Sequence, residues 1–454
     1  MDTTIFINIV YVIAAALFIY GLKLLGHPAT ARQGNKLSAI AMLVAIIVTL
    51  LDQNIVSYNW IIISVLAGSA VGVYVSKKVE MTGMPELVSL FNGVGGLASA
   101  AVAIAAMVGS ELTTGLATIS VIALIIGAVT FSGSLVAWGK LSERISGKPI
   151  VFKSQAIANY GLIAVTVLFS ALYVIFPSSI TFIVLVIALA LAIGVMVVLP
   201  IGGADMPVVI SLLNSYSGLA ACAAGFALEN NLLIVAGALV GASGIILTNI
   251  MCKAMNRSLV NVLTSGFQEV VSMDIVVEGE IKPISADDAF YVLEAAQSIL
   301  VIPGYGMAVA QAQHAMKELQ ELLENNDAEV VYGIHPVAGR MPGHMNVLLA
   351  EADVSYDLLL EMDEVNPRME NFDVAIVIGA NDVVNPAARE LKGSPIYGMP
   401  VINADLAKNV FVIKRSMSSG FAGVDNPLFF KDNTRMIFGD AKEVLNNIVR
   451  QFAD

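Results

Sequence analysis

The first 257 residues alternate long apolar stretches with short polar segments. The apolar stretches lie at about 4–25, 37–51, 55–75, 85–108, 115–139, 154–176, 179–200, 207–228 and 232–252. A helix needs roughly 20 apolar residues to cross about 30 Å of hydrocarbon. Eight stretches reach that length and the second is short, so the pattern predicts a membrane domain of about nine transmembrane helices.

Basic residues in this part of the chain gather at one set of helix ends. They follow predicted helices one, three, five and nine, or precede the helix that comes next: Lys23, Arg32, Lys36, Lys77, Lys78, Lys140, Arg144, Lys148, Lys153, Lys253 and Arg257. Short connections rich in Lys and Arg stay in the cytoplasm. We therefore expect the N-terminus outside and everything after helix nine in the cytoplasm. The first stretch lacks a basic start and a clear cleavage site, which argues against a cleaved signal peptide.

An internal repeat relates predicted helices four and eight. Residues 84–98 read MPELVSLFNGVGGLA and residues 206–220 read MPVVISLLNSYSGLA. Each copy places one asparagine, Asn92 or Asn214, roughly 12 Å inside its helix start. An amide in hydrocarbon is costly unless it is hydrogen-bonded, so we expect both side chains to face the bundle interior.

Two interpretations of these asparagines stay open. They are either polar contacts that hold helices together beside small residues, or part of a wet pathway for a proton or small ion. No Asp, Glu, Lys, Arg or His occupies the middle of a predicted helix. A transport mechanism would therefore need a titrating group near the helix ends (Asp52, Glu86 or Asp205), or one from another subunit.

Composition changes sharply after residue 257. The first 257 residues hold 11 basic and 8 acidic groups, a net +3, and the remaining 197 hold 13 and 28, a net −15. An acidic cytoplasmic part argues against nucleic acid or anionic lipid as a partner. We expect a transmembrane domain at 1–257, a linker at 258–280 and a cytoplasmic domain at 281–454. In the last of these, apolar strands alternate with helical stretches, which is typical of a Rossmann-like, doubly wound parallel α/β sheet.

A glycine-rich turn follows the first predicted strand of this domain, 298–302. Gly304, Tyr305 and Gly306 allow a tight turn and the close approach of a pyrophosphate, whose charge would meet the N-terminus of a helix predicted at 307–324. Val309 and Ala310 stand where the dinucleotide fingerprint has its third glycine, and we expect them to bind the cofactor as well.

The second predicted strand, 329–334, ends in His335 instead of the acid that usually contacts the ribose of NAD. A 2′-phosphate would then be tolerated if basic groups were near. Lys414, Arg415 and Ser416, at the end of the strand predicted at 410–413, are candidates. A solvated strand end is the other interpretation of this basic pair.

Three loops complete the candidate site. Residues Gly379, Ala380, Asn381 and Asp382 open a loop to Pro386 after the strand predicted at 374–378, at the strand ends where such folds bind ligands. Segment 418–423, with Gly420, Phe421, Ala422 and Gly423, has the composition of a lid. Loop 335–344 supplies Arg340 and His344, and for His344 we expect ordinary capping and solvation. We see no nucleophile–base triad, Walker loop or metal site in the sequence.

Taken together in this order behind nine membrane helices, these motifs (304–306, 335–340, 379–386 and 414–416) make the chain resemble the beta subunit of proton-translocating NAD(P) transhydrogenase over nearly its whole length. The resemblance implies a cytoplasmic domain that binds NADP(H), with its nicotinamide facing an NAD(H)-binding domain on a separate alpha subunit. Hydride would pass from NADH to NADP⁺ while a proton moves inward. It further implies a bacterial inner-membrane location and a two-fold assembly of two alpha and two beta chains.

The resemblance also assigns residues. It puts 304–306 at the diphosphate, 414–416 at the 2′-phosphate, 420–423 in the lid, and Asp382 near the cofactor in a coupling role, with His335 and Arg340 at matching positions of the second-strand loop. Phe421 replaces a common tyrosine, and Asn92 stands where well-known members have histidine. We therefore expect Asn92 and Asn214 to order water while the titrating group comes from the partner or the helix ends.

Two other functions are compatible with the composition. One is a transporter or channel whose cytoplasmic domain only senses NADP(H). The other is a dehydrogenase domain with a membrane anchor, which nine helices with a repeated asparagine motif make the weaker choice.

Overall fold

The computed structural model describes residues 3–26, 28–51, 58–109, 112–147, 149–177, 179–255, 258–263, 279–341, 343–392, 394, 396–418, 420 and 423–453. The chain divides into two compact units. The first, here called the helical unit, comprises 1–145, 150–200 and 209–247. The second, the α/β unit, comprises 146–149, 201–208 and 248–454.

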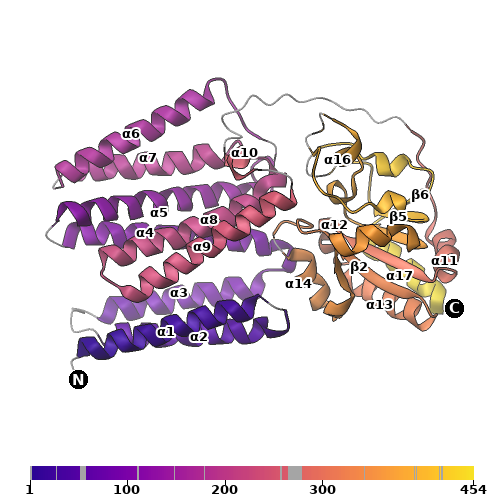
Figure 1. Ribbon diagram of the computed structural model, residues 1–454, viewed down its shortest axis with the longest axis horizontal. Helices are drawn as coiled ribbons and strands as arrows, with labels where there is room; N and C mark the ends of the chain where they lie inside the picture. Colours follow the sequence, from indigo (N-terminus) through magenta and orange to yellow (C-terminus); the bar gives the residue numbers. More distant parts are fainter. Residues whose placement is uncertain are drawn as a thin grey trace. The chain divides into compact units, whose positions relative to one another are not determined.

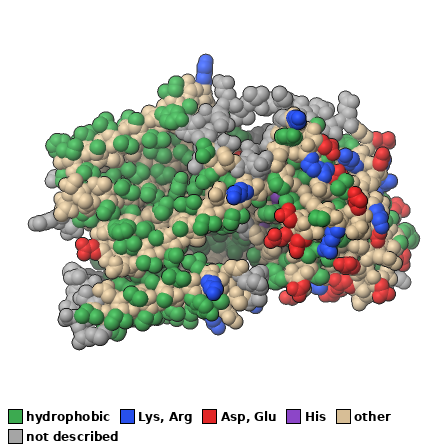
Figure 2. Space-filling model, in the orientation of Figure 1, with side chains coloured by type: hydrophobic (Ala, Val, Ile, Leu, Met, Phe, Trp, Pro, Cys, Tyr) green, Lys and Arg blue, Asp and Glu red, His purple; other side chains and the backbone are tan. Residues whose placement is uncertain are grey.

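Within the described residues, nine helices are long and apolar enough to cross a membrane (Figure 1). They are α1 (Thr3–Leu25), α2 (Pro28–Thr49), α3 (Tyr58–Lys78), α4 (Met84–Gly109), α5 (Thr114–Leu141), α6 (Gln155–Ile175), α7 (Ile180–Val198), α8 (Met206–Ala227) and α9 (Asn231–Ala254). This confirms the predicted number. The second helix is longer than its predicted apolar stretch, because its first turns are polar and carry no apolar pattern. Hydrophobic side chains dominate the outward face of these helices (Figure 2), as lipid requires.

Small residues bring the helices of this unit close together. A Cβ added at Gly96 of α4 would lie 2.7 Å from the carbonyl oxygen of Gly127 in α5, and one at Gly218 of α8 would lie 2.6 Å from the amide nitrogen of Gly241 in α9. Without a strong hydrophobic drive in lipid, such close backbone packing holds helices together. The glycines of the repeated motif therefore have a packing role.

The α/β unit contains a single sheet of six parallel strands in the order β3-β2-β1-β4-β5-β6. The strands are β1 (Ser298–Pro303), β2 (Glu329–Ile334), β3 (Leu359–Glu361), β4 (Val374–Ile378), β5 (Asn409–Lys414) and β6 (Thr434–Phe438). In the central register, Ile299 of β1 pairs with Val330 on one side and Val374 on the other. This strand order is that of a doubly wound dinucleotide-binding fold, so the predicted fold class is confirmed.

The helical elements of this unit connect and cover the strands. They are α10 (Leu259–Leu263), α11 (Ala286–Glu294), α12 (Tyr305–Val309), α13 (Gln313–Asn325), α14 (His344–Glu351), α15 (Met362–Val365), α16 (Ala387–Glu390) and α17 (Ala441–Ala453), with short 3-10 turns including η7 (Ala404–Leu406) and η8 (Pro427–Phe430). β4 is buried along its whole length, which explains its unbroken apolar sequence.

One local prediction was wrong in this unit. The single helix expected at 307–324 is two helices, α12 and α13, because Gln311 takes a positive φ of 48° between them. The described part of segment 258–280 contains the short helix α10, and the expected boundaries of the linker stay a prediction.

Candidate functional site

The point where the strand order reverses lies between β1 and β4. The loops after these two strands touch there through glycines. A Cβ on Gly306 would lie 2.6 Å from the Cα of Gly379, and one on Gly304 would lie 2.5 Å from the Cα of Ala380. The backbone of Gly379 has a φ of +61°, which also favours glycine at this position. Ligands bind at the switch point of such a sheet. Side chains in place of these glycines would fill the space where a ligand would lie.

Two backbone N–H groups of the glycine turn are already used by the protein. Gly304 N donates to the carbonyl of Ile378 at 2.8 Å, and Gly306 N donates to that of Gly379 at 2.9 Å. The helix that follows, α12, has five residues. The long helix N-terminus expected to meet a pyrophosphate is therefore absent. Val309 and Ala310, expected to bind the cofactor, end this short helix.

An aromatic and cationic stack joins the glycine turn to the loop after β2. The guanidinium carbon of Arg340 lies 4.1 Å from the centre of the Tyr305 ring. The His344 ring meets Tyr305 edge-on, with 5.9 Å between centroids. His344 Nδ1 also accepts the backbone N–H of Arg340 at 3.1 Å. Two predicted site segments, the glycine turn and the loop 335–344, thus meet at one place.

His344 is fully buried, so the expected solvated capping role was wrong. Because Nδ1 accepts a hydrogen bond, the proton of the neutral ring is on Nε2, which has no hydrogen-bond partner among the described residues. Burial and the nearby positive charge of Arg340 lower the pKa of His344 to about 4. The ring is therefore neutral at physiological pH.

His335 is also buried and neutral. Its Nδ1 accepts the N–H of Val337 at 3.2 Å, which leaves Nε2 to donate to the carbonyl of Pro400 at 2.8 Å. Burial lowers the pKa of His335 to about 4, and the hydrogen bond to Pro400 opposes that shift. The ring thus ties the end of β2 to the segment between α16 and η7.

Lys414 lies at the end of β5 among groups of both signs. Its Nζ donates to the carbonyl of Ser418 at 2.5 Å and sits 4.6 Å from the centre of the Phe429 ring. Burial lowers the pKa of Lys414, while the carboxylates of Asp382 and Asp425 oppose the shift. Arg415 and Ser416 are exposed beside it. These residues form a cationic, polar end of the strand that suits a phosphate.

The Asp382 loop is joined to the predicted lid. A Cβ on Gly420 would meet the carboxylate of Asp382. With its amide oriented to suit its donors, Asn381 accepts from Lys414 Nζ at 3.3 Å and from Gly420 N at 2.7 Å. Asn426 Nδ2 donates to the backbone carbonyl of Asn381 at 3.1 Å. The lid predictions for Phe421 and Ala422 lie outside the described residues, and Gly423 has φ +70°.

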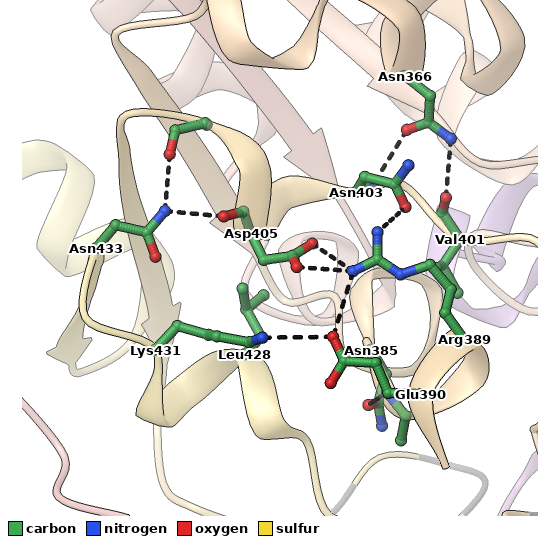
Figure 3. A network of polar contacts seen from close by, with 12 residues as sticks. Asn366, Asn385, Arg389, Glu390, Val401, Asn403, Asp405, Leu428, Lys431 and Asn433 are labelled. Atoms are coloured by element: carbon green, nitrogen blue, oxygen red, sulfur yellow. Dashed lines mark hydrogen bonds and ion pairs between the residues drawn. The ribbon is translucent and has the colours of Figure 1, made fainter. Parts of the chain in front are cut away.

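A polar network fixes the segment that follows the Asp382 loop (Figure 3). Arg389 Nη2 contacts both carboxylate oxygens of Asp405, at 2.8 and 2.7 Å, and Nη1 donates to Asn403 at 2.5 Å. Glu390 lies 3.9 Å from the guanidinium and 3.4 Å from Lys431. The network joins α16 to η7 and to the loop before β6. It therefore fixes the segment that directly follows the loop containing Asp382.

The two repeated asparagines differ in the helical unit. Asn92 is buried, and its Nδ2 donates to the carbonyl of Ile210 in α8 at 3.2 Å. Asn214 is exposed on the surface of this chain, so the expectation that it faces the interior was wrong for the chain alone. Hydropathy could not predict which surface of α8 its neighbours within the chain leave open.

Sequence reasoning missed several groups. Lys140, expected in a cytoplasmic connection, is buried at the end of α5, where its Nζ donates to the carbonyl of Leu199 at 2.5 Å. Asn426 belongs to no recognisable sequence motif, so its bond to the Asn381 loop could not be predicted. The described residues contain no cluster of acids, histidines and cysteines that would hold a metal ion.

This combination defines a multi-pass membrane protein with an α/β domain of doubly wound fold, whose switch point carries glycines, a stacked arginine and a basic strand end. The family model described as NAD(P) transhydrogenase beta subunit matches residues 7–451. Two curated relatives, both named NAD(P) transhydrogenase subunit beta and both from Rhodospirillum rubrum, one of them from a specified strain, are 47% identical over 453 residues and cover 97% of each chain. The chain belongs to the NAD(P) transhydrogenase beta-subunit family and is a subunit of a proton-translocating enzyme. Membership implies nucleotide binding and a partner alpha subunit.

Proposed function

We propose that the α/β unit binds NADP(H) across the β1–β4 switch point, and that hydride passes between this nucleotide and NAD(H) held by the alpha subunit. The observation that carries the proposal is the contact of Gly304 and Gly306 with Gly379, beside the cationic end of β5. Side chains in the glycine positions would fill the place where a dinucleotide crosses such a sheet.

The residues present fit the cofactor. Lys414, Arg415 and Ser416 would hold the 2′-phosphate, since they provide two cations and a hydroxyl in an otherwise acidic domain. Tyr305, stacked under Arg340, would lie at the diphosphate with its flanking glycines. Gly379, Ala380 and Asn381 would line the strand end, and 420–423 would close over it. The bound nucleotide supplies the hydride chemistry, and this chain holds and exposes it.

Coupling would pass through Asp382, His335 and Arg340. Each is fastened to a different segment: Asp382 beside Gly420, His335 to Pro400, and Arg340 to Tyr305. Binding or release of the nucleotide would therefore change the positions of the lid, the α16–η7 segment and the glycine turn together. By linkage, protonation that alters this arrangement must alter nucleotide affinity equally.

In the helical unit we propose that Asn92 and Asn214 order water along the proton pathway. The exposure of Asn214 favours a contact with the alpha subunit at this position. An amide that faces lipid is costly, and a helix of the partner would cover it. The titrating group would come from that helix or from the helix ends. We further propose domain boundaries at 1–257, 258–280 and 281–454. The chain would lie in the bacterial inner membrane with its N-terminus outside, in a two-fold assembly of alpha and beta chains.

Calorimetric titration of the full-length chain in detergent with NADPH and, separately, NADH tests the nucleotide assignment. We expect tight NADPH binding and weak NADH binding. Lys414→Ala and Arg415→Ala should each weaken NADPH binding roughly 10- to 100-fold, as loss of one charge-assisted contact does. Lys442→Ala, at an exposed lysine of α17 in the same domain, is the control and should change nothing. Equal affinity for both nucleotides would overturn the 2′-phosphate assignment.

A further inference from the structure

The cationic end of β5 lies against an aromatic ring of η8. The Nζ atom of Lys414 lies 4.6 Å from the centre of the Phe429 ring. The ring is 3% exposed and belongs to the hydrophobic core of the α/β unit. The face of a phenylalanine ring attracts a cation, and the attraction is strongest where water is excluded. Phe429 therefore holds the ammonium group from one side.

The rest of the fold fixes this ring in position. Asn426 caps η8, because its Oδ1 accepts the N–H of Leu428 at 3.0 Å. Its Nδ2 donates to the backbone carbonyl of Asn381 at 3.1 Å. Leu428 is fully buried beside Phe429 in the same hydrophobic cluster. Since η8 is tied both to the loop after β4 and to the core, the ring presents a rigid surface to the lysine.

The chain that follows Lys414 is held over the same turn. Met417 packs against the hydrophobic cluster that contains Phe429. Lys414 Nζ donates to the carbonyl of Ser418 at 2.5 Å. A lysine side chain is flexible, and fixing it on binding costs conformational entropy unless the protein has already restricted it. The ring and the carbonyl therefore lower the entropic cost of binding an anion at this position.

The ammonium keeps one donor for a ligand. It has three N–H groups. One donates to the carbonyl of Ser418, and a second donates to the side-chain oxygen of Asn381 at 3.3 Å when that amide is oriented to suit its donors. The third has no hydrogen-bond acceptor in the part of the chain that the structure describes. A ring face restricts the ammonium without taking the place of a phosphate oxygen.

The charges around Lys414 make its exact position important. Burial lowers the pKa of Lys414, while the carboxylates of Asp382 and Asp425 oppose the shift and favour the charged form. The same carboxylates repel a phosphate. Binding of the anion therefore depends on where Nζ is held, since a cation drawn toward these acids would no longer face the anion.

We propose that Phe429 is a positioning residue that determines specificity: it holds the ammonium of Lys414 in place for the 2′-phosphate and so favours NADP(H) over NAD(H). The inference rests on the proposed function, in which Lys414 binds that phosphate, and adds a residue to it. NAD(H) has a hydroxyl group at the same position. The contribution of the ring should therefore be absent from NAD(H) binding.

Fluorination of the ring tests this role with little change in its size. Phe429 of the full-length chain in detergent is replaced by phenylalanine analogues with one, two or three ring fluorines, which withdraw electrons from the ring face. The Kd values for NADPH and NADH are measured by calorimetric titration. We expect the Kd for NADPH to rise with each fluorine, by roughly 2- to 30-fold over the series, while the Kd for NADH stays the same.

Phe411 is the matched control. It lies on β5, the strand that carries Lys414, and is 2% exposed. The cation–ring contacts of the described residues do not include it. The same fluorinated analogues at position 411 should leave both Kd values unchanged. Phe429→Leu, which removes the ring, should weaken NADPH binding at least as much as three fluorines do.

The outcomes separate this inference from the proposed function. If the wild-type chain binds both nucleotides equally, the proposed 2′-phosphate site fails. If the wild type prefers NADPH and the fluorinated rings at position 429 bind it as tightly as phenylalanine, only the role of Phe429 is wrong. Equal weakening of NADPH and NADH binding, or the same loss at position 411, would show a packing effect and would also overturn the inference.

Discussion

Asn159 in the helical unit and Asn385 in the α/β unit are both nearly fully buried amides, at 2% and 0% exposure. Asn385 Nδ2 donates to the carbonyl of Asp425 at 3.1 Å, and its Oδ1 accepts the N–H of Ala387 at 2.9 Å. Asn159 has neither bond among the described residues. A fully bonded amide fixes one geometry, whereas an amide left to water permits exchange of partners. This difference suits the proposed roles, in which the α/β unit holds a nucleotide in place and the helical unit lets protons pass.

Acidification should separate the two units most strongly. His335 and His344 have pKa values of about 4 in the folded chain against an ordinary 6.5, so the unfolded chain takes up protons first as pH falls. The stability that their neutral rings contribute is fully present above pH 6.5 and is lost as pH falls toward 4. At about 1.4 kcal/mol per pKa unit, each of the two rings should cost the α/β unit roughly 3 kcal/mol.

Hydrogen exchange of full-length chain between pH 7 and 4 measures this effect, after correction for the intrinsic pH dependence of exchange. Strands β1 and β4 should lose protection, while the helical unit, which has no histidine among its described residues, should not. His314→Gln, at an exposed histidine, is the control. Equal acid sensitivity of both units would contradict this explanation.

Gly379→Ala tests the close packing at the switch point. The new Cβ would collide with the backbone of Gly306 and Met307, and φ +61° is unfavourable for alanine. We expect a loss of about 3 kcal/mol or more in stability together with NADPH binding. Gly343→Ala shares the positive φ, 68°, but meets nothing within 4 Å, so it should cost only about 1 kcal/mol. Thermal unfolding and titration of both variants decide whether contact or backbone strain dominates.

Replacing each buried amide by leucine is the sharpest test of the comparison. Asn385→Leu leaves the N–H of Ala387 and the carbonyl of Asp425 without their partner, and should cost about 2 kcal/mol. Asn159→Leu removes polar atoms that bond to no described residue, and should change stability by less than about 1 kcal/mol. Comparable losses in denaturant unfolding would mean that Asn159 is bonded within the protein and that the two units do not differ.

Arg389→Lys should have the smallest effect. Lysine keeps the charge beside Asp405 but cannot reproduce the guanidinium contacts to Asp405 and Asn403. We expect about 1 kcal/mol of destabilisation, measured by thermal unfolding. Lys317→Gln, which breaks a partly exposed pair with Glu321 on α13, should cost less than about 0.5 kcal/mol. The reverse order would show that the network in Figure 3 carries little stability.

The sequence allowed much of the fold to be predicted, because long apolar stretches and continuous apolar strands carry strong patterns. β2 and β4 were predicted to the residue. β3 was not predicted, because it has only three residues and is partly buried. β6 was not predicted either, because Arg435 interrupts its apolar strand pattern.

The site was predicted as motifs but not as contacts. Glycine spacing indicated the turn at 304–306, but the use of its N–H groups by Ile378 and Gly379 depends on the neighbouring strand. Burial of His344 and the bridge from Asn426 to Asn381 join segments far apart in the chain. The exposure of Asn214 depends on helix packing, which hydropathy does not encode.

The most direct test is proton movement during hydride transfer. Vesicles containing this chain and its alpha subunit, with a pH-sensitive dye inside, receive NADH and NADP⁺, and NADPH formation is followed by chromatography. The internal pH should change in step with NADPH formation. Lys414→Ala should slow both changes together, by the same factor, at NADP⁺ concentrations that just saturate the wild type. NADPH formation with no proton movement in sealed vesicles would contradict the coupling of the two units.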